Sequence, residues 1–314
     1  MFNQRKVGII GTGHVGSHCA LSLMLQGVCD EIVLVDCDEV KAQSQAYDCM
    51  DTAAFLPHRV RVKKGEVKDL GEMDIIVISV GTIDNVSQDR LSELEGSINM
   101  IKSFVPDIMK AGFKGYFVVI TNPVDIVTYF VQKLSGLPHQ YVIGTGTGLD
   151  SARLCRTLSM KLNIDAKSIQ AYMMGEHGDS QMAVFSQVTI NGMGLNSFLK
   201  KIDKEIDLEE VETIVTKAGW DIYTGKKSTE FGIACVCTDI VRAIYSDEKK
   251  VMACSGYLQG HYGEENIYTG VPAIIGKYGV EKVLELDLNK EEKERFNKTT
   301  DIIKKHIKIG EKML

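Results

Sequence analysis

Short apolar segments alternate with stretches of helical periodicity over the first half of the chain. The apolar segments are residues 7–10, 32–35, 74–80 and 116–120, and the periodic stretches between them are residues 15–26, 40–53 and 91–111. Strands that are apolar along their whole length are buried on both faces, and helices between successive strands imply right-handed crossovers. The pattern predicts a doubly wound parallel α/β sheet.

The second half of the chain, from about residue 144, has a different pattern. The expected elements are a helix over residues 150–161, Gly-rich turns, short strand-like runs such as residues 183–190, and a charged helix near residues 203–219. Residues 290–314 carry apolar residues at helical spacing among many charges, which favours an amphipathic capping helix over a membrane-binding one. We therefore expect two tightly packed domains, one over residues 1–144 and an α+β domain over residues 145–314.

Composition and charge exclude several classes of protein. The 314 residues are 44% hydrophobic and 25% charged, and a formal net charge of −6 provides no basic field for nucleic acid or an anionic membrane. The sequence shows neither a signal-peptide pattern nor an apolar run approaching the ~18 residues of a membrane helix. We expect a cytoplasmic protein with no nucleic-acid or membrane partner.

The eight cysteines are scattered and form no C-x-x-C pair. Cys235 and Cys237 have the wrong spacing for a zinc ribbon or a redox motif, and they would lie on one face of a strand or within a buried helix. Reduced cysteines that act as small apolar residues fit a cytosolic protein. We expect no metal site.

A glycine motif at residues 11–16 (Gly-Thr-Gly-His-Val-Gly) lies between a predicted strand and a predicted helix. In that setting Gly11 permits a tight turn, Gly13 lets the backbone approach a pyrophosphate, and Gly16 lets helix and strand pack closely. Free N–H groups at the helix N-terminus would bind the phosphates. The motif predicts a Rossmann dinucleotide-binding domain, with a flavin or another nucleotide as the alternative ligand.

Asp36 ends the next predicted strand, at the ~20-residue interval expected for an acid that binds the adenosine ribose. Its charge would repel a 2′-phosphate, so we expect NAD as the cofactor in preference to NADP. His14 lies inside the loop and is expected to contribute only its backbone.

His177 lies within residues 174–180 (Met-Gly-Glu-His-Gly-Asp-Ser). Reduction of a ketone by NADH needs a proton donor beside the hydride acceptor, and histidine titrates in the useful range. A single histidine is more often structural than catalytic. The prediction of a catalytic role therefore depends on three further features.

The first feature is a pair of charged residues, Asp150 and Arg153, three positions apart on one face of a predicted helix. Asp150 could accept a hydrogen bond from the ring of His177 and raise the pKa of the imidazole. Arg153 could pair with a substrate carboxylate in a fixed, two-bond geometry. An ion pair on the helix surface is the alternative interpretation.

The other two features are Asn122 and Arg90. Asn122 lies in residues 121–125 (Thr-Asn-Pro-Val-Asp), at the carboxyl end of a strand, where ligands of such sheets bind. It could contact the substrate oxygen or the nicotinamide amide, although Pro123 could instead mark only a turn. Arg90 lies in the polar stretch 81–95, which could close as a lid and polarise the reacting carbonyl; a solvated loop arginine is the alternative.

Together these residues make the sequence resemble the lactate/malate dehydrogenase family over essentially its whole length, and in particular the L-lactate and L-2-hydroxyisocaproate branches. The similar positions are residues 11–16, Asp36, and residues 121–125, 146–153, 175–180 and 271–275. The resemblance implies reversible hydride transfer between NADH and a small 2-oxo acid, such as pyruvate to L-lactate. It also implies a C-terminal catalytic domain and a homotetramer, with a dimer as the alternative.

The resemblance implies a role for each matching residue. His177 becomes the proton donor and acceptor, with Asp150 as its partner and Arg90 as the polarising lid arginine. The implied substrate contacts are Arg153, Asn122 and Thr229, together with Asp84 at the specificity position. The implied cofactor contacts are Gly11, Gly13, His14, Val15, Gly16, Asp36, Gly81, Thr82, Asn122 and Thr145.

The specificity position departs from the family pattern. Lactate enzymes usually carry a glutamine six residues before the lid arginine and malate enzymes an arginine, whereas this chain carries Asp84. A carboxylate there opposes the second carboxylate of oxaloacetate, so malate is disfavoured. The stretch 81–90 also lacks the usual Pro-Gly-Glu, and a gap would bring Asn85 or Val86 into the pocket. An L-2-hydroxyisocaproate dehydrogenase for longer aliphatic 2-oxo acids is therefore the alternative.

Two positions bear on regulation. Many bacterial lactate dehydrogenases are activated by fructose 1,6-bisphosphate through an arginine and a histidine, and the matching positions here are Cys155 and Gln170. Neither side chain is cationic, so we expect no activation by the bisphosphate.

Two other classes of protein share parts of the pattern. A non-enzymatic NAD sensor would need neither the Asp150–His177 pair nor two convergent arginines. An NAD-dependent, metal-assisted glycosidase would need a cysteine–histidine metal pair, and no cysteine adjoins Asn122. The sequence therefore favours the dehydrogenase.

Overall fold

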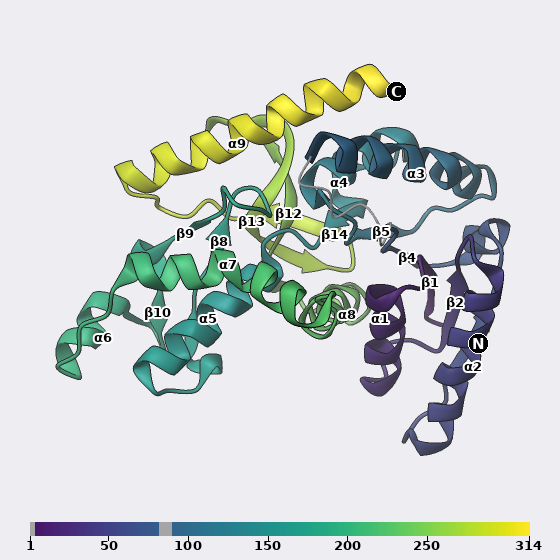
Figure 1. Ribbon diagram of the computed structural model, residues 1–314, viewed down its shortest axis with the longest axis horizontal. Helices are drawn as coiled ribbons and strands as arrows, with labels where there is room; N and C mark the ends of the chain where they lie inside the picture. Colours follow the sequence, from purple (N-terminus) through teal and green to yellow (C-terminus); the bar gives the residue numbers. More distant parts are fainter. Residues whose placement is uncertain (1–3, 82–89) are drawn as a thin grey trace.

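The computed structural model describes residues 4–81 and 90–314, with side chains from residue 93 onward in the second range (Figure 1). The elements of the first half are β1 (Lys6–Ile10), α1 (His14–Leu25), β2 (Glu31–Val35), α2 (Glu39–Thr52), β3 (Arg61–Lys64), β4 (Ile75–Ile78), α3 (Arg90–Lys110), β5 (Tyr116–Val119), α4 (Val124–Ser135) and β6 (Val142–Gly144). The elements of the second half are α5 (Gly148–Leu162), β7 (Ile169–Gln170), β8 (Met173–Met174), β9 (Met182–Ala183), β10 (Thr189–Ile190), β11 (Met193–Gly194), α6 (Leu195–Lys201), α7 (Leu208–Lys226), α8 (Phe231–Tyr245), β12 (Lys250–Gln259), β13 (Glu265–Gly276), β14 (Gly279–Val283) and α9 (Lys290–Gly310).

The first half forms a parallel sheet with strand order β3-β2-β1-β4-β5-β6. The chain runs outward from β1 to β3 on one side and from β4 to β6 on the other. The order therefore reverses between β1 and β4, which is where ligands bind in sheets of this kind. The prediction of a doubly wound parallel sheet is confirmed.

The sheet does not stop at the end of the first half. An antiparallel ribbon, β12-β13-β14, continues it beyond β6. Within the described part of the chain, the whole sheet then has nine strands. The junction is the pairing of Ser255 on β12 with Gly144 on β6. A Cβ on Gly144 would lie 2.5 Å from both Ser255 Oγ and Thr128 Oγ1, so only glycine lets the two strands meet here. The two halves of the chain thus share one sheet.

Several predicted elements differ from the structure. Strand β3 (Arg61–Lys64) was missed, because it is an edge strand in which only Val62 is buried. The run expected over residues 183–190 contains the short strands β9 and β10 separated by a 3₁₀ turn at Phe185–Gln187. The helix expected near residues 203–219 lies at Leu208–Lys226, because the side chain of Asp207 accepts from two first-turn N–H groups and fixes its start.

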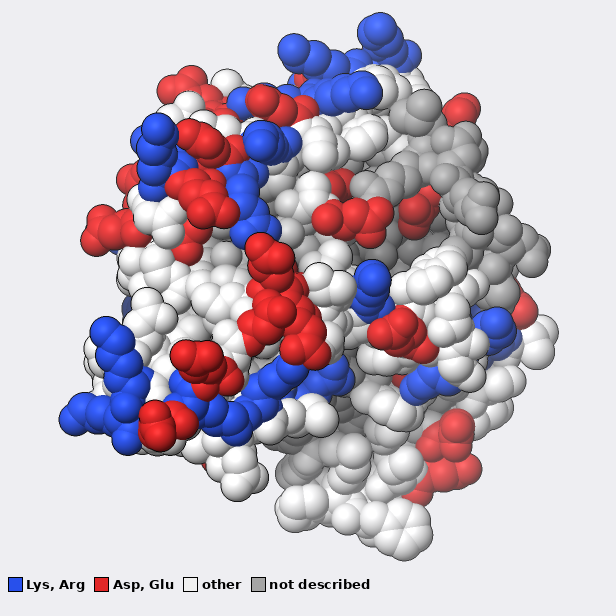
Figure 2. Space-filling model, turned by 60° about the vertical axis from the view of Figure 1, so that its left-hand side comes forward, with Lys and Arg blue, Asp and Glu red and all other residues white. Residues whose placement is uncertain are grey.

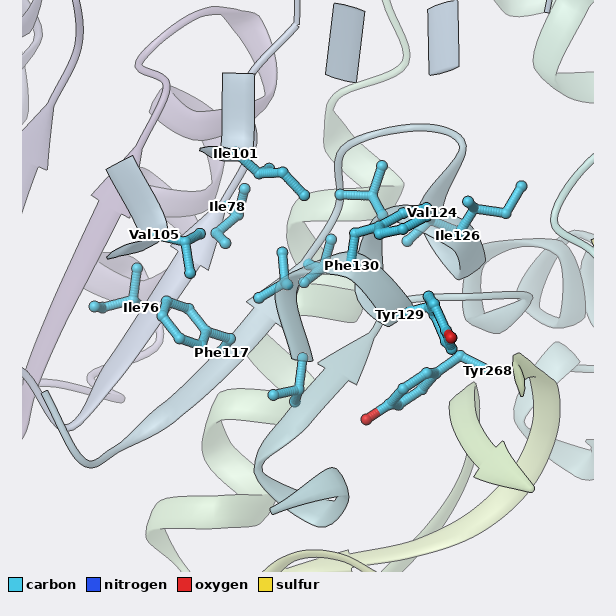
Figure 3. Packing of buried hydrophobic residues seen from close by; sticks show 14 of the residues in the cluster. Ile76, Ile78, Ile101, Val105, Phe117, Val124, Ile126, Tyr129, Phe130 and Tyr268 are labelled. Carbon is cyan, nitrogen blue, oxygen red and sulfur yellow. The ribbon is translucent and has the colours of Figure 1, made fainter. Parts of the chain in front are cut away.

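A large apolar core lies between the sheet and the helices α3, α4 and α9. Ile76 of β4, Phe117 of β5, Ile101 of α3 and Phe130 of α4 belong to one buried cluster (Figure 3). Tyr268 of β13 joins the same cluster and is fully buried, so the second half contributes directly to this core. Each such side chain contributes roughly 1.5–3 kcal/mol through burial of its apolar surface.

The C-terminal helix α9 covers one side of this core, as the amphipathic pattern predicted (Figure 1). It begins with a capping box, in which Asn289 and Glu292 satisfy each other's backbone N–H groups. Phe296, Ile303 and Ile307 face the core and are buried. The helix also carries Thr299 toward the loop that holds His177.

Acidic and basic side chains are interspersed over the face seen in Figure 2, which is the left-hand side of Figure 1 turned forward. No helix in the described part of the chain is long and apolar enough to span a membrane. Cys235 and Cys237 both lie on α8, as the helical alternative expected, but only Cys237 is buried; Cys235 is exposed, so the expected burial is wrong for that residue.

Candidate active site

The glycine loop joins β1 to α1 at the point where the strand order reverses. Gly11 has a φ of +86°, and a Cβ there would lie 2.5 Å from the carbonyl oxygen of Ser79. A Cβ on Gly16 would lie 1.9 Å from the carbonyl oxygen of Gly11, so both positions require glycine. Gly13 is the N-cap of α1, and the first N–H groups of the helix, at His14 and Val15, are those that a helix leaves without intrahelical partners.

Two charged residues lie beside this loop. Asp36 Oδ2 accepts from the backbone N–H of Thr12 (2.6 Å) and from its hydroxyl (3.0 Å), so the acid at the end of β2 is held against the loop. Burial acts to raise the pKa of Asp36, but the hydrogen bonds from Thr12 and Asp38 outweigh it and lower the pKa overall. On the other side, Lys41 Nζ would lie 3.9 Å from a Cβ on Gly13.

This arrangement fits a dinucleotide. The open space at Gly13 and the N-terminus of α1 suit a pyrophosphate, and the ionised Asp36 suits ribose hydroxyl groups. Lys41 adds a cation at the same place, which sequence reasoning missed because a lysine on α2 has no signature of its own. Among the other predicted cofactor residues, Gly81 is exposed and Thr145 is buried at the end of β6, whereas Thr82 lies outside the described residues.

His177, Asp150 and Arg153 come together as the sequence predicted. His177 Nδ1 lies 2.6 Å from Asp150 Oδ2, and Arg153 donates to Asp150 Oδ1 at 2.9 Å. Asp150 is completely buried, the side chain of Arg153 is 8% exposed and that of His177 is 25% exposed. Asp150 and Arg153 both lie in the first two turns of α5, three positions apart, so the helix presents them to one place.

The charges around His177 determine its protonation. Burial acts to lower the pKa of His177, but the charge of Asp150 and its hydrogen bond outweigh this effect, and the pKa is raised. Burial acts to raise the pKa of Asp150, while the charges of His177 and Arg153 and their hydrogen bonds lower it overall. The pair therefore favours a protonated ring beside an ionised carboxylate.

The loop that carries His177 is fixed at several points. Gly175 exchanges two backbone hydrogen bonds with Gly270 of β13, both 2.9 Å long. The N–H of Glu176 donates to Thr299 Oγ1 on α9 (2.9 Å), and the N–H of His177 donates to Asp125 Oδ2 on α4 (2.8 Å). Elements from both halves of the chain thus position the imidazole.

Two cavities are lined by His177 and Arg153, one by each side chain. One, of about 190 Å³, is lined by Glu93, Leu94, Asn122, Pro123, Ile126, Glu176, His177, Gly178 and His306. The other, of about 400 Å³, is lined by Leu149, Ala152, Arg153, Arg156, Ile222, Lys226, Thr229, Glu230, Phe231 and Gly232. His177 and Asn122 therefore line one cavity, and Arg153 and Thr229 line the other. Asp150 contacts both His177 and Arg153 but lines neither cavity.

Some predicted residues lie outside what the structure describes. Asp84 is not among the described residues, and Arg90 begins α3 without a described side chain. Conversely, Asp125, Thr299 and Ser255 contact the site but were given no role from the sequence. Asp125 ends the quoted 121–125 segment, so a signal was present there, whereas Thr299 and Ser255 had none.

Among the described residues, no cluster of three or more histidine, cysteine or acidic side chains is arranged to hold a metal ion. What the site offers is a histidine with an ionised partner, a nearly buried guanidinium and a loop suited to a dinucleotide. These groups can exchange a proton with an oxygen and pair with a carboxylate.

Comparison with known proteins finds two family models on the chain. The model described as lactate/malate dehydrogenase, NAD binding domain, matches residues 5–144, and that described as lactate/malate dehydrogenase, alpha/beta C-terminal domain, matches residues 147–314. The chain is 55% identical over 313 residues to the L-lactate dehydrogenase of Fusobacterium nucleatum subsp. nucleatum, covering 99% of this chain and 98% of that protein. It is 44% identical over 309 residues to L-lactate dehydrogenase 3 of Bacillus cereus, covering 98% of each.

Solved structures give the same result. The minor L-lactate dehydrogenase of Enterococcus mundtii in its ligands-bound form superposes with a TM-score of 0.94 at 36% identity, covering 98% of each chain. A lactate dehydrogenase from a Medee basin deep-sea metagenome library superposes with a TM-score of 0.94 at 34% identity, covering 98% of this chain and 99% of the other.

Proposed function

We propose, from the premise that the chain belongs to the lactate/malate dehydrogenase family and is an NAD-dependent oxidoreductase, that it acts as an L-lactate dehydrogenase. The reaction is the transfer of a hydride and a proton to pyruvate, giving L-lactate and NAD⁺, and its reverse. The relatives named above are L-lactate dehydrogenases, which supports this choice of substrate.

The observation that carries the proposal is the Asp150–His177 contact. A ring whose pKa is raised by a buried carboxylate can donate its proton to the oxygen of a 2-oxo acid, and the resulting neutral ring can take a proton back from a 2-hydroxy acid. Because Nδ1 faces Asp150, the other ring nitrogen, Nε2, is the atom that exchanges this proton. A bound NADH supplies the hydride.

The remaining residues bind and orient the substrate in this proposal. Arg153 pairs with the carboxylate, using N–H groups that do not contact Asp150, and Thr229 lines the same cavity. Asn122, beside His177 in the other cavity, contacts the reacting oxygen or the nicotinamide amide. Arg90 polarises the carbonyl and stabilises the charge that develops on its oxygen.

The cofactor site follows the same logic. Gly11, Gly13, Gly16 and the first N–H groups of α1, at His14 and Val15, cradle the pyrophosphate. Asp36 accepts from the adenosine ribose, and Lys41 adds a favourable charge for the phosphates. Gly81, Thr82, Asn122 and Thr145 complete the proposed contacts with the rest of the dinucleotide.

A second candidate reaction is the reduction of longer aliphatic 2-oxo acids such as 2-oxoisocaproate. The observation that favours it is the specificity stretch, in which Asp84 replaces the glutamine that lactate enzymes usually carry. The same acid opposes a second substrate carboxylate, so oxaloacetate is disfavoured in either case.

The deciding experiment is a comparison of kcat/KM with NADH for pyruvate, 2-oxobutyrate, 2-oxoisocaproate, phenylpyruvate and oxaloacetate. Pyruvate ahead of the others supports the L-lactate dehydrogenase. Branched or longer chains ahead would replace it with the second candidate, and oxaloacetate ahead would contradict both. Failure to oxidise NADH with any of the five acids would contradict the dehydrogenase function itself.

We further propose the cellular and structural setting. The protein acts in the cytoplasm as a homotetramer, with a dimer as the alternative, and fructose 1,6-bisphosphate does not activate it. Residues 1–144 form the cofactor domain and residues 145–314 the catalytic domain. The proposed ligands are anions, and because the net charge of −6 does not attract them, a few placed cationic side chains and the N-terminus of α1 must bind them.

A further inference from the structure

We propose that Asp125 is a positioning residue for His177. Asp125 holds the backbone of the loop that carries His177 (the catalytic loop) and keeps a second negative charge close to the imidazole. The proposal rests on the function proposed above, because it concerns the proton that His177 exchanges with the substrate. Asp125 lies in the first turn of α4, three residues after Asn122.

The geometry ties three elements together at one carboxylate. Asp125 Oδ2 accepts the backbone N–H of His177 at 2.8 Å, and Oδ1 accepts the hydroxyl of Ser255 at 2.6 Å. Ser255 lies on β12 and pairs with Gly144 of β6, the one residue pair that joins these two strands in the described part of the chain. The catalytic loop is thereby fixed to α4 and to the junction between the parallel and antiparallel parts of the sheet.

A neutral residue would make the same contacts at lower cost. Asp125 is 1% exposed, and its burial raises the pKa of the carboxyl to about 6, in spite of the two hydrogen bonds and the charge of His177. Asparagine could accept from the N–H of His177 and donate to Ser255 Oγ without any ionisable group. The two hydrogen bonds therefore do not explain why residue 125 is an acid, and its negative charge must have a separate effect.

The charge of Asp125 acts on the imidazole in the same direction as that of Asp150. Both acids raise the pKa of His177, while burial and the charge of Arg153 oppose them. The other titratable groups near this carboxylate or the cavity are Glu176 on the same loop, Cys254 on β12, Glu93 on α3 and His306 on α9. Of the two acids that raise the pKa of His177, Asp150 contacts the ring and Asp125 accepts from the backbone N–H of His177.

The experiment compares the pH profile of kcat/KM in wild type and in Asp125→Asn, using NADH and whichever 2-oxo acid of the panel is reduced best. The substitution keeps both hydrogen-bonding positions and removes only the charge. The alkaline limb, where His177 loses its proton, should move to lower pH by roughly half a unit or more. The dissociation constant for NADH should not change.

A matched control removes one negative charge elsewhere. Asp107→Asn lies on the exposed face of α3, where Asp107 pairs with Lys110, and it should leave the profile of the wild type unchanged. An alkaline limb that stays in place in a folded, NADH-binding Asp125→Asn protein overturns the proposal, whatever happens to kcat. Wild-type turnover tests the function separately from this shift.

A second variant decides the question if Asp125→Asn does not fold. Ser255→Ala removes the hydroxyl that stabilises the ionised carboxylate, so Asp125 becomes harder to ionise and its charge acts less on His177. The alkaline limb should then move in the same direction by a smaller amount. A Ser255→Ala profile that superposes on that of the wild type would contradict the proposal.

Discussion

Asp150 and His177 form a contact of 2.6 Å between Oδ2 and Nδ1, and the opposite oxygen of the same carboxylate receives Arg153 at 2.9 Å. One buried acid thus orients both the group proposed to exchange the proton and the group proposed to bind the substrate carboxylate. His177 lines one cavity of the site and Arg153 lines the other. Substitutions of Asp150, His177 and Arg153 should therefore change the rate of the reaction and the binding of the substrate in different proportions.

Replacing His177 with asparagine should abolish turnover while leaving NADH binding intact. The imidazole is the proposed proton donor, and general acid–base groups contribute about 10²–10⁴-fold to the rate. The measurement is kcat for oxo-acid reduction, with NADH binding followed by fluorescence. His261→Asn, at the far end of the β12–β13 hairpin, is the control and should retain the wild-type rate. Retained turnover in His177→Asn would remove the proposed role.

Replacing Asp150 with asparagine should lower kcat/KM by about 10²-fold or more and move the pH profile. Asp150 raises the pKa of His177, so without its charge the ring loses its proton at lower pH. Reduction, which needs the protonated ring, should then fail earlier as pH rises, and oxidation of the hydroxy acid, which needs the neutral ring, should begin at lower pH. pH profiles with the same midpoint for wild type and Asp150→Asn would contradict the role of Asp150 in raising the pKa of His177.

The same substitution should also destabilise the fold. It leaves the guanidinium of Arg153 nearly buried without its carboxylate, and breaking a buried ion pair in this way costs about 3 kcal/mol. Urea unfolding of wild type and Asp150→Asn measures the difference. Asp107→Asn, which breaks an exposed pair, should lie within about 1 kcal/mol of wild type.

Asp36→Asn should relax the preference for NADH over NADPH. The ionised Asp36 repels a 2′-phosphate, whereas the amide keeps an acceptor for the N–H of Thr12. Removing a like-charge contact worth at least ~1.4 kcal/mol should change the ratio of kcat/KM values by tenfold or more. Asp48→Asn, exposed on α2, should leave the ratio unchanged. An unchanged ratio in Asp36→Asn would exclude this basis for cofactor choice.

Fructose 1,6-bisphosphate should not activate the enzyme. Cys155 Sγ contacts the carbonyl oxygen of Ile169, the residue before Gln170, at 3.5 Å. Neither Cys155 nor Gln170 has a side chain with a positive charge for a phosphate. Initial rates at subsaturating substrate, with and without the bisphosphate, test this expectation. A severalfold rise in rate would contradict it.

The parts of the fold that the sequence predicted are those with a strong local pattern. Strands β1, β2, β4 and β5 are apolar along their length because helices cover both faces, and the helices between them have regular periodicity. Strand β3 was not predicted because its outer edge is solvated and three of its four residues are basic. The continuation of the sheet into β12 was not predictable, because it depends on close approach at Gly144 and Ser255.

The residues of the site likewise fall into those with a local sequence pattern, which could be predicted, and those without one. The glycine loop, Asp36 and the residues around His177 were found because their spacing within short segments reflects their chemistry. Asp125, Thr299 and Ser255 act through partners 52, 123 and 130 residues away, and no local pattern indicates such contacts. Only the fold shows which residues hold the catalytic loop in place.

Asp125→Asn should gain stability relative to wild type as pH rises from acid to neutral, although we propose that it shifts the pH profile of turnover. The folded-state pKa of Asp125, about 6, lies above the value of an unfolded aspartate, so its contribution to stability is fully present below about pH 4 and is lost as pH rises through 6. Asparagine does not titrate. The stability of the variant relative to wild type should therefore increase between about pH 4 and pH 7, by on the order of 3 kcal/mol.

Urea unfolding at several pH values measures this difference, with Asp107→Asn as the control. The exposed carboxylate of Asp107 pairs with Lys110, and its removal should leave the pH dependence of stability close to that of wild type. A relative stability of Asp125→Asn that is flat with pH would show that Asp125 is ionised in the folded protein as readily as in the unfolded chain. In that case the buried carboxylate would carry no energetic cost, and an effect of its charge on His177 would not be needed to account for an acid at this position.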